Sequence, residues 1–91
     1  MRLTYDPAKD AHNVSTRGIS FAAAADFEWS GALIVEDRRR DYGERRMRAM
    51  GYLDGRLHVV VFTDRADATH VISLRRANQR ERTTYERLSQ S

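Results

Sequence analysis

Two arginines stand where strand-like segments of the sequence end. Arg65 follows Phe62-Thr63-Asp64, and Arg75 closes an alternating segment that begins at Thr69. A guanidinium group is planar, and its fork of N–H donors matches two oxygens of a phosphate. If the hairpin between the segments is tight, we expect both guanidinium groups at one end of a sheet. There they would hold a phosphate and stabilise the charge that it gains when a phosphodiester is cleaved.

The basic residues are almost all arginine, and they are unevenly distributed. Of 16 basic residues only Lys9 is lysine. Residues 1–37 hold three basic and six acidic groups (net −3), whereas residues 38–91 hold thirteen and seven (net +6). A basic second half indicates a nucleic acid or an acidic protein as the partner. Solvation or an ion pair remains an alternative for Arg75, and solvation of the turn with pairing to Asp67 remains one for Arg65.

Four side chains are candidates for acid–base chemistry. Metal-free RNA cleavage needs a base for the 2′-hydroxyl proton and an acid for the leaving 5′ oxygen. Glu44 and Glu81 are candidate general bases, and His58 and His70 are candidate acids or bases. Glu81 also fits a helix-capping role, and both histidines alternate with apolar neighbours. Capping and core packing are therefore open alternatives for these three residues.

No metal or cofactor site is indicated by the residue spacing. The chain has no cysteine, and its three histidines form no short-spaced pair or cluster with aspartate. Asp37 and Asp41 are four residues apart, but they lie in an arginine-rich run and are expected to pair with it. We therefore predict catalysis without a metal or a cofactor.

Side-chain alternation suggests which residues face a ligand. A period of two puts Val71, Ser73 and Arg75 on one face and Ile72 and Leu74 on the other. The apolar side chains of Ile72 and Leu74 are expected to pack on helices. Ser73 and Arg75 should therefore point away from the helical layer. Tyr42 and Tyr85 lie in basic, exposed contexts where an aromatic ring can stack on a base. The expected RNA contacts are Arg45, Arg46, Ser73, Arg76 and Tyr85.

The elements that must position these residues begin with a short strand and two helices. Residues 2–5 read as a strand, and Asp6 followed by Pro7 is typical of a helix start. Gly18 is a typical helix stop. Ser20 then begins a second helix that is expected to reach about residue 28.

The rest of the chain predicts a sheet and one closing helix. Residues 32–35 read as a strand, and Asp54-Gly55 is a strong hairpin signal between two strands of an antiparallel meander. Asn78, with Glu81 three residues later, has the form of a capping box for a final helix over residues 79–89. The predicted order is β-α-α-β-β-β-β-α. We expect one α+β domain over residues 1–91, with an antiparallel sheet packed by two N-terminal helices and a C-terminal helix. The predicted meander strands cover residues 46–53, 57–63 and 69–75.

The sequence also predicts a compartment. No segment approaches the roughly 18 apolar residues that a membrane-spanning helix needs. The N-terminus has no apolar signal region. We expect a cytoplasmic protein without membrane contact.

Five motifs in order resemble the BrnT family of ribonuclease toxins. Any one of them is weak, but together they cover nearly the whole chain. The motifs are Tyr5-Asp6-Pro7-Ala8-Lys9; Arg17-Gly18-Ile19-Ser20-Phe21; Glu36-Asp37-Arg38-Arg39 with Asp41-Tyr42-Gly43-Glu44-Arg45; Asp54-Gly55-Arg56-Leu57 through Val61-Phe62-Thr63-Asp64-Arg65; and Ile72-Ser73-Leu74-Arg75-Arg76-Ala77 with Arg80-Glu81-Arg82 and Tyr85-Glu86.

The resemblance implies a RelE-like fold and RNA cleavage that inhibits translation. It also implies a hetero-oligomer with a BrnA-like ribbon-helix-helix antitoxin, which carries the complex to operator DNA. By position it makes Arg65 and Arg75 the first choices for catalysis, together with Asp64 and Glu44. Asp64 replaces the family's usual Glu, and Leu74 replaces a usual small residue. A weakened or non-catalytic binding module of an operon-repressing complex is therefore the alternative.

Overall fold

The computed structural model describes residues 1–90 and begins with strand β1 (Leu3–Thr4) and helix α1 (Pro7–Arg17). Asp6 caps α1, because its Oδ1 accepts the N–H of Ala8 at 2.8 Å. Gly18 ends the helix at φ 72°, a left-handed conformation that glycine adopts without steric cost. The predicted start and end of this helix are confirmed.

The predicted second helix is wrong in type, because the chain forms two short 3-10 helices there. They are η1 (Phe21–Asp26) and η2 (Trp29–Gly31). Ser20 caps η1 as expected, since its hydroxyl accepts the N–H of Ala22. The chain then leaves the helical path, and the N–H of Glu28 donates to the carbonyl of Tyr52 at 2.9 Å. That tertiary hydrogen bond to the sheet competes with further helical turns. In the observed element order, two short 3-10 helices therefore replace the predicted second α-helix.

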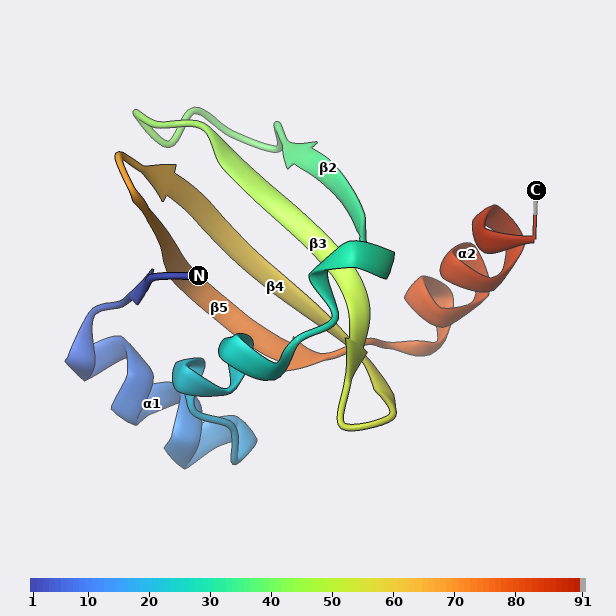
Figure 1. Ribbon diagram of the computed structural model, residues 1–91, viewed down its shortest axis with the longest axis horizontal. Coiled ribbons are helices and arrows are strands. Elements are labelled where there is room, and N and C mark those ends of the chain that lie inside the picture. The colour runs from blue at the N-terminus through green and yellow to red at the C-terminus, as the bar shows by residue number, and fades with distance from the viewer. Residues whose placement is uncertain (91) are drawn as a thin grey trace.

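The five-stranded sheet has the order β1-β5-β4-β3-β2 (Figure 1). The remaining strands are β2 (Leu33–Asp37), β3 (Arg46–Leu53), β4 (Arg56–Arg65) and β5 (Ala68–Arg76). Strands β2 to β5 pair antiparallel, and Asp54-Gly55 turns between β3 and β4 with positive φ at both residues. The sheet is nevertheless mixed rather than antiparallel throughout. Strand β1 runs parallel to β5 and pairs Thr4 with His70.

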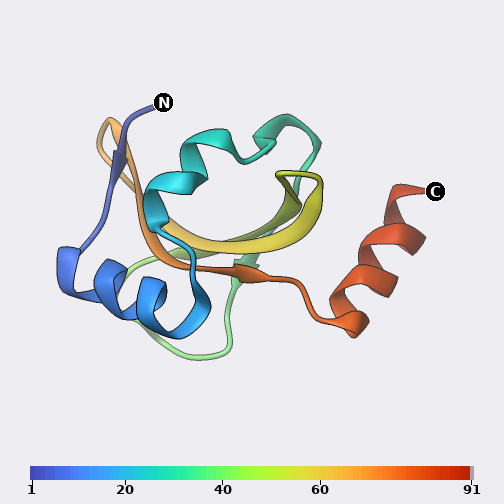
Figure 2. The ribbon, with the colours of Figure 1, turned by 90° about the horizontal axis from the view of Figure 1, so that it is seen from below.

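The two faces of the sheet are covered differently. The 3-10 helices pack on one face, while helix α2 (Gln79–Ser89) lies at the far end of the molecule (Figure 2). We call the face toward η1 and η2 the core face, and the opposite one the open face. Helix α2 packs on the open face only near the start of β4, where Leu57, Val59 and Ala77 contact Tyr85. The buried residues of the core face are Phe21, Ala24, Phe27, Ala49, Leu53, Val60, Phe62, Val71 and Leu74.

A register shift in β5 corrects the predicted assignment of side chains to faces. Val61 pairs with Ser73 but Phe62 pairs with Val71, so Ile72 is an extra residue. Such a bulge reverses the alternation beyond it. Val71 and Leu74 consequently both reach the core face, although strict alternation placed them on opposite faces.

No helix within residues 1–90 is long and apolar enough to cross a membrane.

Candidate active site

The expected pairing of Arg65 with Arg75 at one end of the sheet is wrong. Arg65 pairs with Ala68 at the β4–β5 turn, whereas Arg75 pairs with Val59 near the other end of the hairpin. Arg75 lies seven positions after Ala68 along β5, which is roughly 23 Å at about 3.3 Å per residue. One phosphate cannot contact both guanidinium groups. The open face therefore carries two separate groups of charged side chains.

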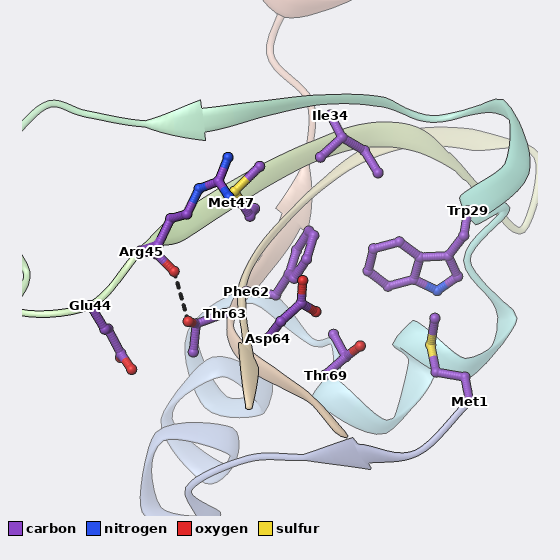
Figure 3. A pocket seen from close by; sticks show the side chains of 10 residues that line it. All are labelled: Met1, Trp29, Ile34, Glu44, Arg45, Met47, Phe62, Thr63, Asp64 and Thr69. Atoms are coloured by element: carbon purple, nitrogen blue, oxygen red, sulfur yellow. Dashed lines mark hydrogen bonds between the residues drawn. The ribbon is translucent and has the colours of Figure 1, made fainter. Parts of the chain in front are cut away.

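The first group, which we call the hairpin-end cluster, consists of Glu44, Arg65 and His70. The Arg65 Nη2 donates to both carboxylate oxygens of Glu44, at 3.2 and 3.4 Å. Both side chains reach solvent, with 50% of Arg65 and 35% of Glu44 exposed. The hydroxyl of Thr63 donates to the carbonyl of Arg45 at 2.7 Å (Figure 3). This bond fixes the segment that carries Glu44 against the end of β4.

His70 completes the cluster from strand β5. His70 pairs across strands with Thr63, and Thr63 lies two residues before Arg65 in β4. The side chains of Thr63, Arg65 and His70 therefore share the open face. The Nδ1 of His70 lies 2.8 Å from Thr4 Oγ1. Burial lowers the pKa of His70, and the positive charge of Arg65 lowers it further, whereas Glu44 opposes this effect. The imidazole is therefore mostly neutral at pH 7. The sequence made His70 a candidate but gave no sign that Thr4 would orient it.

Asp64 lies apart from this cluster, because it alternates with Arg65 along β4. It lines a cavity of about 500 Å³ together with Trp29, Phe62 and Thr69. Figure 3 shows the Asp64 carboxylate near Phe62 and Thr69, with Glu44 at the far side of the cavity. Asp64 therefore shares the core face with Phe62, and its predicted catalytic role requires a substrate that reaches this face at the end of β4.

The second group, the α2-end cluster, consists of Arg48, Arg75 and Glu81. Arg75 donates through Nη1 and Nη2 to the two carboxylate oxygens of Glu81, each at 2.8 Å. The hydrogen bond to Glu81 raises the pKa of Arg75, and the same contact lowers the pKa of Glu81, where Arg48 adds a smaller effect. Glu81 also accepts the Asn78 N–H at 2.9 Å and completes a capping box. Both alternatives left open by the sequence, an ion-paired Arg75 and a capping Glu81, are confirmed.

The loop that carries Glu44 is held by a buried carboxylate. Asp37 has a side chain only 1% exposed, and it accepts two hydrogen bonds from the Arg39 guanidinium, at 2.9 and 2.8 Å. The Tyr42 hydroxyl donates to the same carboxylate at 3.2 Å. The hydrogen bonds from Arg39 hold the pKa of Asp37 well below its usual range. The expected pairing of Asp37 with its arginine-rich run is thereby confirmed.

Among the expected RNA contacts, Arg45 and Arg76 are the most accessible, whereas Arg46 is half-buried. Arg45 is 72% exposed and pairs with Glu36 at 3.0 Å. Arg76 is exposed at the end of β5. The guanidinium carbon of Arg46 lies 4.0 Å from the ring centroid of Tyr42, so this cation covers the ring proposed for base stacking.

The other two expected contacts are engaged within the protein. The Ser73 hydroxyl accepts from Arg17 of α1 at 3.1 Å. Tyr85 packs edge-on against Tyr52, with ring centroids 5.5 Å apart, and its hydroxyl donates to the carbonyl of Gly31. Tyr85 therefore anchors α2 to the sheet rather than presenting a free stacking surface.

Within residues 1–90, no three or more His, Asp or Glu side chains gather as they would to hold an ion. The groups that converge on the open face are guanidinium, carboxylate and imidazole, which can bind a phosphate and transfer a proton.

The fold and the open face define a small α+β protein with an arginine-rich sheet surface. The sequence profile described as ribonuclease toxin, BrnT, of type II toxin-antitoxin system matches residues 5–81. The chain therefore belongs to the BrnT family of ribonuclease toxins, and such a toxin implies an antitoxin partner.

A solved structure agrees with this assignment. The chain is similar to the crystal structure of the Brucella abortus ribonuclease toxin, BrnT, with a TM-score of 0.68 and 25% identity. The match covers 87% of this chain and 99% of the Brucella chain. No curated protein matches the sequence.

Proposed function

We propose that this chain is an endoribonuclease toxin that cleaves RNA at the hairpin-end cluster without a metal ion, and so inhibits translation. The observation that carries the proposal is the convergence of Glu44, Arg65 and His70 on one end of the open face. Together they supply a carboxylate, a permanent cation and a neutral imidazole, within reach of solvent.

The reaction assigned to this cluster transfers two protons. When the Nδ1 of His70 carries its proton and donates to Thr4 Oγ1, Nε2 keeps a lone pair for the substrate. Nε2 takes the proton of the RNA 2′-hydroxyl, and the 2′ oxygen attacks the adjacent phosphorus. The bond from phosphorus to the 5′ oxygen breaks, and a 2′,3′-cyclic phosphate remains. Solvent water protonates the leaving 5′ oxygen, and the hydroxide that forms takes the proton from Nε2, which restores the neutral imidazole.

Arg65 and Glu44 have supporting roles in this scheme. The Arg65 guanidinium binds the phosphate and stabilises the charge that develops on its oxygens. Glu44 orients Arg65 through their ion pair. An exposed pair of this kind contributes only about 0–1 kcal/mol, so a phosphate can displace the carboxylate at small cost. Glu44 is also the second candidate for the general base.

Arg75 has no catalytic role in this proposal. Its distance from Arg65 along β5 places it outside the same scissile phosphate, and its guanidinium is occupied by Glu81. We assign Arg75 to holding α2 on the sheet. Asp64 remains a candidate for an RNA contact at the neighbouring cavity, with a shorter side chain than the Glu that the family resemblance led us to expect.

The proposal includes a RelE-like fold and a BrnA-like antitoxin. The mixed sheet with its terminal helix and exposed arginines supports the first, and family membership supports an antitoxin of some kind. In this proposal the antitoxin is a ribbon-helix-helix protein that forms a hetero-oligomer with the chain. It alone contacts operator DNA, and no membrane is involved.

The test is RNA cleavage by the purified chain in the presence of EDTA. We expect wild-type protein to cleave and Arg65→Ala to lose most activity, while Arg56→Ala, an exposed arginine of the β3–β4 hairpin, serves as the matched control. Absence of cleavage by the wild type would contradict the enzymatic proposal. Cleavage that requires added divalent cations would contradict its metal-free part.

A non-catalytic binding module is the second candidate function. The observation that favours it is that both first-choice arginines, Arg65 and Arg75, are ion-paired with carboxylates of the chain itself. Salt-dependent binding of RNA without cleavage, and no growth arrest on expression, would support this candidate.

A further inference from the structure

The open face holds a second feature, which lies between the sheet and α2. We call it the α2 groove, a cavity of about 500 Å³. Its floor is aliphatic and comes from three strands: Leu33 and Val35 of β2, Met50 of β3 and Val59 of β4. Val35 is 50% exposed, and it belongs to β2, an edge strand of the sheet. An exposed apolar edge of this kind is a ready surface for association.

The walls of the groove are positively charged. Four arginines line it: Arg39, Arg48, Arg75 and Arg80. Arg39 is paired with Asp37, and Arg75 with Glu81. Neither Arg48 nor Arg80 forms an ion pair within residues 1–90. The groove thus presents net positive charge above an apolar floor.

We infer that the α2 groove binds an acidic, amphipathic segment of the antitoxin. A segment with apolar residues on one side and carboxylates on the other would cover Val35 and Met50 and pair with Arg48 and Arg80. Grooves that receive amphipathic peptides combine these features. Methionine adapts its shape to such a ligand. The inference rests on the antitoxin partner that the family implies and is independent of the catalytic assignment.

The composition of the groove favours protein over RNA as its occupant. Sites for single-stranded RNA combine basic groups with aromatic rings on which bases stack. The floor here is made of leucine, valine and methionine. Tyr52 and Tyr85 beside α2 pack edge-to-face against each other.

The experiment uses overlapping peptides that cover the protein encoded next to this chain's gene. Binding to the full-length chain is measured by fluorescence anisotropy. We expect Val35→Asp to weaken binding by at least about tenfold, because it places a charge on the apolar floor. Ile34→Asp is the matched control: Ile34 is 46% exposed on the same strand but faces the other side of the sheet. It should change binding by no more than about twofold.

A second pair of variants guards against misfolding of the first. Arg80→Glu reverses one charge of the groove, and we expect it to weaken peptide binding, whereas Arg56→Glu on the β3–β4 hairpin should not. Circular dichroism and thermal unfolding confirm that each variant is folded. Each variant is also tested for binding of a labelled single-stranded RNA.

The outcomes distinguish an antitoxin peptide from RNA as the occupant of the groove, and they test the groove inference separately from the catalytic proposal. No peptide binding by the wild type, or equal binding by Val35→Asp and Ile34→Asp, overturns the inference. Loss of RNA binding with retained peptide binding in Val35→Asp assigns the groove to RNA and also overturns it. If wild-type protein cleaves no RNA but Val35→Asp loses the peptide, this inference stands and the catalytic proposal falls.

Discussion

The two ends of the open face use the same pair of residue types for different purposes. At the hairpin end, Arg65 reaches Glu44 through one nitrogen, and half of the arginine side chain is exposed. At the α2 end, Arg75 donates to Glu81 through two nitrogens. The exposed fraction of the side chain is 31% for Arg75 and 17% for Glu81. Pairing an arginine with a glutamate therefore does not define a function. The role of each pair depends on the other hydrogen bonds that its carboxylate accepts and on the access of water to the pair.

The contrast has an energetic basis. Glu81 accepts the Arg75 fork and the Asn78 N–H together, so its carboxylate is close to fully satisfied. Releasing Arg75 would leave a partly buried charge without its partner, which is costly. Within residues 1–90, Glu44 has only Arg65 as a partner and can exchange it for water. We therefore expect chemistry at the hairpin end and rigidity at the α2 end.

The largest expected effect separates the two arginines by activity. Arg65→Ala should lower kcat about 10² to 10³-fold, the usual cost of removing a donor that stabilises transition-state charge. Arg75→Ala should lower kcat by a smaller factor, through loosening of α2. Single-turnover cleavage of a labelled RNA measures both. A larger loss in Arg75→Ala would reverse the comparison and move the active site to the α2 end.

The pH dependence of cleavage tests His70 as the base. Its pKa lies below the usual 6.5 because of burial and then of Arg65, and a base acts in its unprotonated form. The kcat/KM should therefore be level near pH 7 and fall as pH drops below 6.5 through the pKa of His70. His70→Gln should lower kcat about 10²-fold and remove this limb. His12→Gln, on the exposed side of α1, is the control. Loss of the limb in Glu44→Gln alone would assign the base to Glu44.

Stability should show the opposite ranking of the two ion pairs. Arg75→Ala should reduce the free energy of unfolding by about 1–2 kcal/mol, between the values for surface and buried pairs, whereas Arg65→Ala should cost about 0–1 kcal/mol. The pKa of folded Glu81 is lowered, so its contribution is present above pH 4.5 and is lost as pH falls below that value. Urea unfolding of both variants at pH 7 and pH 3.5 measures this. Equal losses at pH 7 would show that burial does not distinguish the pairs.

The smallest expected effect concerns the cap of α2. Asn78→Ala removes the side chain that accepts the N–H of Glu81 at 2.8 Å, and should cost about 1 kcal/mol. Asp6→Ala at the start of α1 removes an equivalent cap and is the matched comparison. Hydrogen exchange should show faster opening confined to α2 in the first variant. Opening that spreads to the hairpin-end cluster would indicate that the two ends are coupled.

Local chemistry made much of the fold predictable. The caps at Asp6, Ser20 and Asn78 and the hairpin at Asp54-Gly55 depend on neighbours a few residues away, and all four are found. The strands of the meander followed from side-chain alternation. The second helix failed because its competitor, a bond from Glu28 to Tyr52, joins residues far apart in sequence.

The site was less predictable, because its members come from distant segments. Glu44 and Arg65 were named as catalytic candidates and His70 as a possible acid or base. Their proximity depends on the register of β4 against β3 and β5, which no local pattern reports. The expected meeting of Arg65 and Arg75 failed for the same reason, since adjacent strands can place two strand ends together or at opposite ends.

By itself the sequence determined an arginine-rich α+β chain, the starts of α1, η1 and α2, and the family to which it belongs. Only the tertiary structure decided which arginine stands beside an imidazole. It paired β1 parallel to β5, which brought Thr4 to His70, and it inserted Ile72 as an extra residue. Capping and turn preferences act over three or four residues, where the chain has few choices. Strand register is selected by the burial of the whole core, and so it is settled only when the complete fold forms.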